Sequence, residues 1–261
     1  MSIHPISLGN KMDGHFKLNE IMNRNITEWS EISWNPTTGC TPISMGCANC
    51  YAIPRAEKMQ FDGVSKYSGG FKLTLHPGQL SRNFDDLKPS RIFVNSMSDL
   101  FHKDVPLEFI QKVFEVIAAN PKHLFLVLTK RAEIMYQYRN DLIWPSNLLM
   151  GVTVEHAEYK HRIDLLRDTK AIYKVVFFEP LLSEMGDVDL TGIQWAFIGG
   201  ESGPGFRGVR SAWVRSLKDR CDSQGCTFVF KQWGGYPREK YGCRLDGIYY
   251  QDIPKVESCL G

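Results

Sequence analysis

Seven short apolar segments recur along the chain, and they limit its possible folds more than any other feature. Most are continuous apolar runs rather than alternating ones, a pattern typical of strands buried on both faces of a parallel sheet. Helical segments separate several of them, at intervals of about 25–30 residues, which indicates right-handed βαβ units. The runs span residues 31–35, 91–97, 123–130, 148–155, 171–180, 193–201 and 226–235.

Two of the intervening segments carry clear helix signals. Residues 105–120 place apolar side chains on one face and begin near Pro106. Residues 211–225 are amphipathic as well, with Ser211 expected as the N-cap and Gly225 as the stop. Six or seven such units favour an α/β fold, a partial TIM-like (β/α)6–7 barrel. An open doubly wound sheet is the alternative, because periodicity does not distinguish a closed sheet from an open one.

The chain divides into three parts on this interpretation. Residues 1–30 form an N-terminal extension, 31–235 the barrel, and 236–261 an irregular C-terminal tail packed on it. A long insertion, residues 36–90, follows the first strand. It holds three cysteines, an expected helix around 51–60 and a short extra strand in the sequence GGFKLTLHPG.

Composition excludes some classes of protein. No run approaches the roughly 18 apolar residues of a membrane span, and the first 20 residues lack the apolar core of a signal peptide. We therefore expect a cytoplasmic protein without membrane contact. The net charge of +2 is close to neutral and does not indicate a basic surface for binding nucleic acid. Seven cysteines in a reducing compartment favour metal or redox chemistry over a disulfide framework.

Polar side chains gather at the predicted strand ends. In parallel architectures, chemistry collects where strands end and the following loops begin. We therefore expect these groups to form the rim of an active site. They are Ser96, Ser98, Asp99, Lys130, Arg131, Thr153, Glu155, Glu179, Glu201, Lys231 and Gln232.

Three cysteines, Cys40, Cys47 and Cys50, lie together in the insertion with the spacing Cys-x6-Cys-x2-Cys. A Cys-x2-Cys pair suits a zinc or an iron–sulfur site. A structural zinc ion needs a fourth ligand, for which His102, His156 or Cys243 are candidates. A [4Fe–4S] cluster held by three cysteines instead leaves one iron open to a further ligand. Three incidental thiols are the remaining alternative, since cysteine is often a small core residue.

The cysteine loop and its position resemble those of the radical S-adenosylmethionine (SAM) enzymes, which carry three cysteines after the first strand of a partial (β/α) barrel. WNPTTGCTPISMGCANCYA, FVNSMSDLFHKDVP, LTKR, EPLL, IGGESGPGFR and FVFKQWGG together resemble the phage Gp37/Gp68-like family, also known as domain of unknown function 5131. The match runs from about residue 31 to the C-terminus. Two features depart from the radical SAM pattern: the first cysteine gap is six rather than three, and the second strand ends in NSMSD rather than Gly-Gly-Glu.

The resemblance implies a fold of radical SAM type, a metal-binding function and two cofactors. Cys40, Cys47 and Cys50 would bind a [4Fe–4S] cluster, and the open iron would chelate SAM. Reductive cleavage of SAM would give a 5′-deoxyadenosyl radical, with a flavodoxin or ferredoxin type of reductant as electron donor. We assign SAM contacts to Ser96, Ser98, Asp99, Lys130, Thr153 and Glu155, and substrate contacts to Arg131, Glu179, Glu201, Lys231 and Gln232.

The residues leave the reaction open. The substrate is a nucleotide or DNA base by the family's phage association, or else a small metabolite, and no residue is singled out as catalytic. One alternative is SAM-dependent transfer of an aminocarboxypropyl or methyl group by a noncanonical cluster enzyme. The other is a zinc-stabilised binding module without enzymatic activity.

Overall fold

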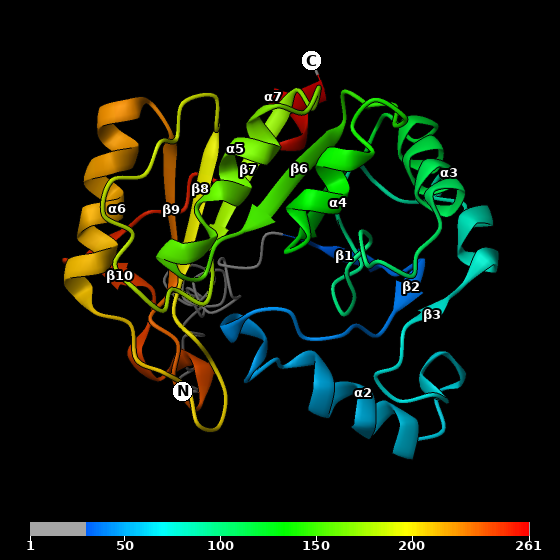
Figure 1. Cartoon of the computed structure of the whole chain (residues 1–261), viewed down its shortest axis with the longest axis horizontal. Coiled ribbons are helices and arrows are strands. Elements are labelled where there is room, and N and C mark those ends of the chain that lie inside the picture. Colours follow the sequence, from blue (N-terminus) through cyan, green and yellow to red (C-terminus); the bar gives the residue numbers. More distant parts are fainter. Residues whose placement is uncertain (1–29, 261) are drawn as a thin grey trace, which may run out of the picture.

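The computed structural model describes residues 30–260, and its centre is one sheet of seven parallel strands (Figure 1). The predicted extension 1–30 lies, except for its last residue, outside the described residues. Each predicted apolar run contains one strand of this sheet. The strands, in their order across the sheet, are β1 (Ile32–Trp34), β4 (Arg91–Val94), β5 (Leu124–Thr129), β6 (Leu148–Thr153), β7 (Tyr173–Phe178), β8 (Trp195–Gly199) and β9 (Thr227–Gln232).

Strand order decides between the two predicted architectures. Every crossover leads to the next position in the same direction, from β1 at one edge to β9 at the other. A doubly wound sheet reverses its strand order at a switch point. Right-handed connections that all advance in one direction place their helices on one face, so the twisted sheet curls around the other. The sheet is therefore a curled, open half-barrel, which confirms the predicted partial (β/α) barrel (Figure 1).

The two faces of the sheet bury separate apolar layers. On β7, Val176 and Phe178 belong to the large outer core beneath the helices, whereas Val175 and Phe177 belong to a smaller inner layer. This alternation follows from the two-residue period of a strand. In the inner layer the Phe177 ring stacks on Phe197 of β8, with centroids 4.4 Å apart.

Six helices accompany the sheet within the described residues. Gly225 ends the longest of them in a left-handed conformation (φ 68°), as predicted. Arg210, rather than Ser211, occupies its N-cap position, so Ser211 is its first helical residue. The helices are α2 (Ala52–Phe61), α3 (Leu107–Ala118), α4 (Ala132–Gln137), α5 (His161–Arg167), α6 (Ser211–Gln224) and α7 (Val256–Leu260).

The two ends of the sheet are covered differently. The strands point toward the side where α2 and the insertion lie, and α7 lies at the opposite side (Figure 1). α7 adds Val256 and Cys259 to the inner apolar layer. The tail from 236 onward, which we expected to be irregular, contains this helix and a hairpin of β10 (Arg244–Leu245) and β11 (Ile248–Tyr249).

The insertion between β1 and β4 has its own small framework. β2 (Thr37–Thr38) pairs in antiparallel fashion with β3 (Thr74–Leu75), the predicted extra strand. The cysteines lie between β2 and α2, and the short 3-10 helix η1 (Met45–Cys47) contains one of them. Among the described residues, no helix is long and apolar enough to cross a membrane.

Candidate functional site

The cysteine loop, residues 40–50, lies against the carboxyl ends of several strands. Its first cysteine follows Gly39, whose backbone forms a bridge with Ser98. The Ser98 hydroxyl donates to the Gly39 carbonyl at 2.7 Å. Gly39 has a φ of +77°, and a Cβ there would lie 2.1 Å from the Lys72 carbonyl oxygen. Only glycine fits this position, and its close packing fixes where the backbone of Cys40 begins after β2.

Arg131 holds Cys40 from the end of β5. Its guanidinium donates to the Cys40 sulfur at 3.4 Å and to the Asp99 carboxylate at 2.9 Å. It also donates to the Thr41 carbonyl at 2.7 Å. Burial and the charge of Asp99 raise the pKa of the Cys40 thiol, and the Arg131 charge opposes that rise. Arg131, predicted to bind substrate, thus contacts the cysteine loop.

Both carboxylate oxygens of Asp99, the partner of Arg131, accept hydrogen bonds from the protein. One carboxylate oxygen accepts from the Phe101 amide at 3.0 Å and the Thr129 hydroxyl at 2.8 Å. The other accepts from the Lys130 amide at 3.1 Å and from Arg131. A carboxylate with four donors has little capacity for another ligand. Its place in the structure is that of a buried anchor for Arg131.

The middle cysteine, Cys47, has a polar and cationic environment. Its burial would raise the pKa of the thiol, but the Lys130 charge and hydrogen bonds from Ser44 and the Ile43 backbone lower that pKa below its ordinary value. The Ser44 hydroxyl lies 3.5 Å from the sulfur. A lowered pKa favours the thiolate, which is the form that binds metals.

Glu155 ties this part of the loop to the end of β6. The Ser44 hydroxyl donates to Glu155, and Arg162 donates to the other carboxylate oxygen at 2.9 Å. Gly46 lies directly on the Glu155 side chain, since a Cβ there would come within 2.6 Å of it. Arg162 also donates to the carbonyl of Thr153, the last residue of β6, at 2.7 Å. Glu155 is fully buried and is part of the support of the loop.

Glu201, after β8, holds the last turn of the loop. It accepts from the Asn49 amide at 3.0 Å, next to Cys50. Arg207 donates to the same carboxylate through its backbone at 2.8 Å and through Nε at 2.9 Å. Arg207 also donates to the Met45 carbonyl at 3.0 Å. These contacts to Asn49 and Arg207 could not be expected from sequence, because neither residue ends a strand.

Glu179, Lys231 and Gln232 form a second polar cluster, at the ends of β7 and β9. The Lys231 ammonium and the Gln232 amide donate to the two Glu179 oxygens at 2.5 and 2.9 Å. Burial would raise the pKa of Glu179, but these two groups hold that pKa below its ordinary value. The side-chain amide oxygen of Gln232 is buried and has no partner among the described residues. Gly199 of β8 leaves room for this cluster, because a Cβ there would lie 2.9 Å from Glu179.

The strand-end residue Asn95 has two unusual properties. Its backbone is left-handed, with a φ of 57°, which is uncommon for a residue other than glycine. Its side-chain oxygen accepts from the Thr37 amide at 3.0 Å, while its buried amide nitrogen has no partner among the described residues. Neighbouring Ser96 donates to the Asn35 side chain at 3.3 Å. Asn95 also belongs to the polar residues at the end of the apolar run 91–97 in the sequence, although no cofactor or substrate contact was assigned to it.

The two Gly-Gly sequences, 199–200 and 234–235, meet backbone to backbone. A Cβ on Gly200 would lie 2.0 Å from the Trp233 carbonyl oxygen, and one on Gly234 would lie 2.1 Å from that of Glu201. Trp233 itself donates from its indole to the Arg244 carbonyl at 2.8 Å, so it packs on the tail. The glycines therefore allow the segments after β8 and β9 to approach each other closely.

Thiolates are the donors that an iron–sulfur cluster requires, and the loop carries three thiols. All three are free and partly buried. A single tetrahedral zinc ion, with Zn–S bonds of about 2.3 Å, needs its thiolates within about 4 Å of one another. Each thiolate of a [4Fe–4S] cluster binds a different iron, and the ligands therefore lie farther apart. In the part of the chain that is described, no three or more Cys, His, Asp or Glu side chains are arranged so that they could bind a single metal ion.

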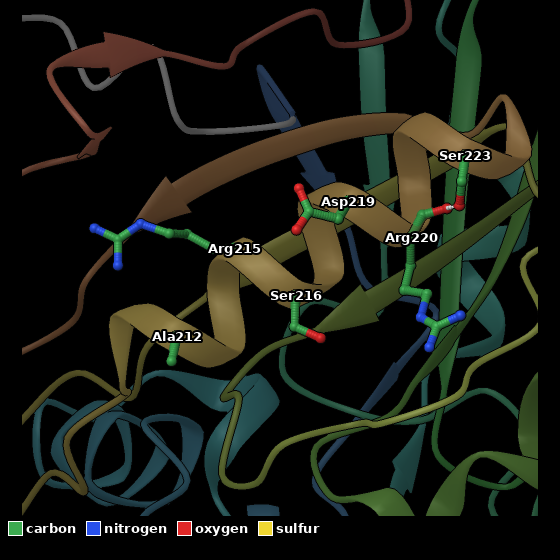
Figure 2. A pocket seen from close by; sticks show the side chains of 6 residues that line it. All are labelled: Ala212, Arg215, Ser216, Asp219, Arg220 and Ser223. Atoms are coloured by element: carbon green, nitrogen blue, oxygen red, sulfur yellow. Dashed lines mark hydrogen bonds between the residues drawn. The ribbon is translucent and has the colours of Figure 1, made fainter.

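A shallow hollow on the outward face of α6 contains none of the predicted site residues (Figure 2). Its two arginines point away from each other, and both are paired with carboxylates. Arg215 binds Asp246 at 2.6 Å, and Arg220 binds Asp187. The hollow therefore offers no uncompensated cation. Its lining consists of Ala212, Arg215, Ser216, Asp219, Arg220 and Ser223.

Comparison with known proteins gives one family and two similar structures. A family model described as protein of unknown function (DUF5131) matches residues 24–254. A cysteine-to-alanine mutant of spore photoproduct lyase with dinucleoside spore photoproduct is 11% identical, with a TM-score of 0.43, over 72% of this chain and 60% of that one. Spore photoproduct lyase complexed with dinucleoside spore photoproduct is 12% identical, with a TM-score of 0.39 and the same coverage. The chain thus spans 60% of the length of these structures. The search among curated proteins returned no match.

Proposed function

We propose that this chain, which belongs to the DUF5131 family, is a cytoplasmic radical SAM enzyme. One observation carries the proposal: three free, partly buried thiols share a loop at the carboxyl ends of an open parallel half-barrel. Thiols in that position face the region where α/β folds place their chemistry. The phage Gp37/Gp68 designation of the family is part of the same proposal.

Cys40, Cys47 and Cys50 would hold a [4Fe–4S] cluster. When bound and reduced by a flavodoxin or ferredoxin type of donor, this cluster supplies the electron that cleaves SAM to a 5′-deoxyadenosyl radical. Three thiolates are one fewer than the four irons, so the chain leaves one coordination place for SAM. The loop itself is held by Arg131 and by Glu155, from β5 and β6.

We assign the SAM contacts to those predicted residues whose side chains do not support the cysteine loop. The Lys130 ammonium lies near Cys47 and makes no hydrogen bond within the described residues, so it suits the SAM carboxylate. Ser96 offers a hydroxyl two residues after β4, and Thr153 offers one at the end of β6. Ser98, Asp99 and Glu155 act in this assignment by supporting the loop.

The substrate side is assigned to Glu179, Lys231 and Gln232. The unpaired side-chain amide oxygen of Gln232 supports this, because a buried acceptor without a partner is costly unless a ligand donates to it. Glu179 and Lys231 neutralise each other, which suits a neutral polar group better than a phosphate. Within the proposed classes, this favours contact with a base or another uncharged part of the substrate.

The test is anaerobic reconstitution with iron and sulfide, followed by SAM and dithionite and by mass spectrometry for 5′-deoxyadenosine. We expect a brown protein that forms this product. The Cys40→Ala/Cys47→Ala/Cys50→Ala variant should bind no cluster and form none. Cys243→Ser is the matched control, since Cys243 is also partly exposed but lies in the tail.

Other outcomes point to the alternatives. Methylthioadenosine in place of 5′-deoxyadenosine would indicate aminocarboxypropyl transfer, and S-adenosylhomocysteine would indicate methyl transfer. A colourless protein that holds stoichiometric zinc through the same cysteines, and that fails to accept iron and sulfide, would contradict the proposal and favour a zinc-stabilised binding module.

A further inference from the structure

Arg131 is the one predicted substrate residue that contacts a cysteine of the loop in the described structure. It lies two residues after the end of β5, directly before α4, and is 6% exposed. One guanidinium nitrogen donates to both the Cys40 sulfur and Asp99, at 3.4 and 2.9 Å. The other donates to the Thr41 carbonyl and hydroxyl, at 2.7 and 3.2 Å. These four contacts commit both terminal nitrogens of Arg131 to the loop and to Asp99.

Neighbouring residues fix the position of Arg131 and stabilise its positive charge. The Thr129 hydroxyl donates to Asp99 and accepts from the Arg131 amide, both at 2.8 Å. The charge of Asp99 raises the pKa of Arg131, against the effect of burial. His102 supports Thr41 from the other side, with its Nε2 2.7 Å from the Thr41 hydroxyl. Because His102 Nδ1 accepts from the Asp104 amide at 3.2 Å, its Nε2 carries the proton and donates.

We propose that Arg131 is a positioning residue that raises the reduction potential of the cluster through its hydrogen bond to the Cys40 sulfur. This inference rests on the proposed function. Reduction adds one electron and therefore one negative charge to the cluster and its thiolates. A cation and an N–H donor beside a ligand sulfur stabilise the more negative state, and sulfur hydrogen bonds are among the features that set cluster potentials. Arg131 thereby eases entry of the electron.

The test compares midpoint potentials of the reconstituted protein, measured by a dithionite titration followed by electron paramagnetic resonance. One electron enters each cluster, and no protein bond is formed or broken. The main variant is Arg131→Met/Asp99→Asn, which removes the hydrogen bond to sulfur and leaves no buried carboxylate unpaired. We compare the two proteins at the potential where half of the clusters in the unmodified protein are reduced. At that potential, we expect the ratio of reduced to oxidised cluster in the double variant to be roughly tenfold lower than in the unmodified protein.

Arg131→Lys is the second variant. A lysine keeps the ion pair with Asp99 but lacks the planar fork that reaches Cys40 and Thr41 together. We expect a smaller decrease in the same direction. Arg167→Met is the matched control, because Arg167 ends α5 and pairs with Asp164 and Asp189. Its cluster should have the potential of the unmodified protein.

The outcomes separate this inference from the proposed function. If the unmodified protein assembles no cluster, the proposed function fails, and the role of Arg131 fails with it. If clusters assemble and the variants keep the potential of the Arg167→Met control, Arg131 only supports the loop. Variants that contain less iron but keep the potential of the unmodified protein would also show that Arg131 only supports the loop. If the double variant holds no iron, the potential of Arg131→Lys decides.

Discussion

The cysteines of the loop and those at the junction of α6 and β9 occupy opposite environments. Cys40, Cys47 and Cys50 are partly exposed and lie beside charged groups such as Arg131 and Lys130. Cys221 and Cys226 are 0% and 4% exposed and belong to the outer apolar core. The difference teaches that the surroundings of a thiol, rather than its spacing alone, decide whether it is reactive or structural.

The junction pair has a clear structural role. The Cys226 amide donates to the Cys221 carbonyl at 3.0 Å across the left-handed Gly225. This is the hydrogen bond of a Schellman helix end, where the same two positions usually share an apolar contact. The hydrogen bond with Cys226, together with burial, raises the pKa of the Cys221 thiol. These cysteines act as small core residues.

The largest expected difference between the two regions is in alkylation. In metal-free protein at pH 8, iodoacetamide should modify the loop cysteines at least on the order of 10³-fold faster than Cys221 and Cys226, because the buried pair reacts only after the structure opens. Peptide mass spectrometry over time measures both rates. Equal rates would mean that the junction opens as readily as the loop.

The second expected difference is in stability. Cys221→Ser places a hydroxyl in the apolar core and should lower the free energy of unfolding by about 2 kcal/mol. Cys47→Ser, in metal-free protein, should change it by less than about 0.5 kcal/mol, since that site is polar and partly exposed. Urea denaturation of the two variants beside the unmodified chain measures this. A larger loss for Cys47→Ser would reverse the comparison.

The smallest expected effect concerns pH. Burial and the Arg131 charge lower the pKa of His102, which supports the loop through Thr41. Below the unfolded pKa of about 6.5, the unfolded state therefore binds more protons, and stability falls as pH drops. Since His76 and His123 also have lowered pKa values, the fall should persist but be smaller in His102→Gln. Urea midpoints at pH 7.5 and 5.5 measure it, and an unchanged fall would exclude His102.

Much of the fold could be predicted from the sequence, for identifiable reasons. Runs such as 123–130 and 171–180 are apolar throughout, and β5 and β7 are buried on both faces. The strong amphipathic pattern of 105–120 became α3, and Gly225 ended α6 as expected. The short helices α4 and α5 were not predicted, because six or seven residues carry little periodicity. The tail was expected to be irregular for the same reason.

The sequence pointed to several residues that contact the cysteine loop, but it did not predict those contacts. Polar residues at strand ends do gather around the loop, as Asp99, Arg131, Glu155 and Glu201 demonstrate by their contacts. Their roles depend on partners that sequence does not reveal. Asp99 was expected to contact SAM, yet four protein donors already surround it.

By itself, the sequence determined the seven strands, the parallel class and the three neighbouring thiols, because burial patterns and spacing are local properties. Only the tertiary structure decided the direction of every crossover, and with it the half-barrel. It also decided that Arg131 contacts Cys40 across 91 residues of sequence, and that Asn49 reaches Glu201 across 152. Such contacts depend on which strand ends become neighbours, and that follows from the packing of the whole chain.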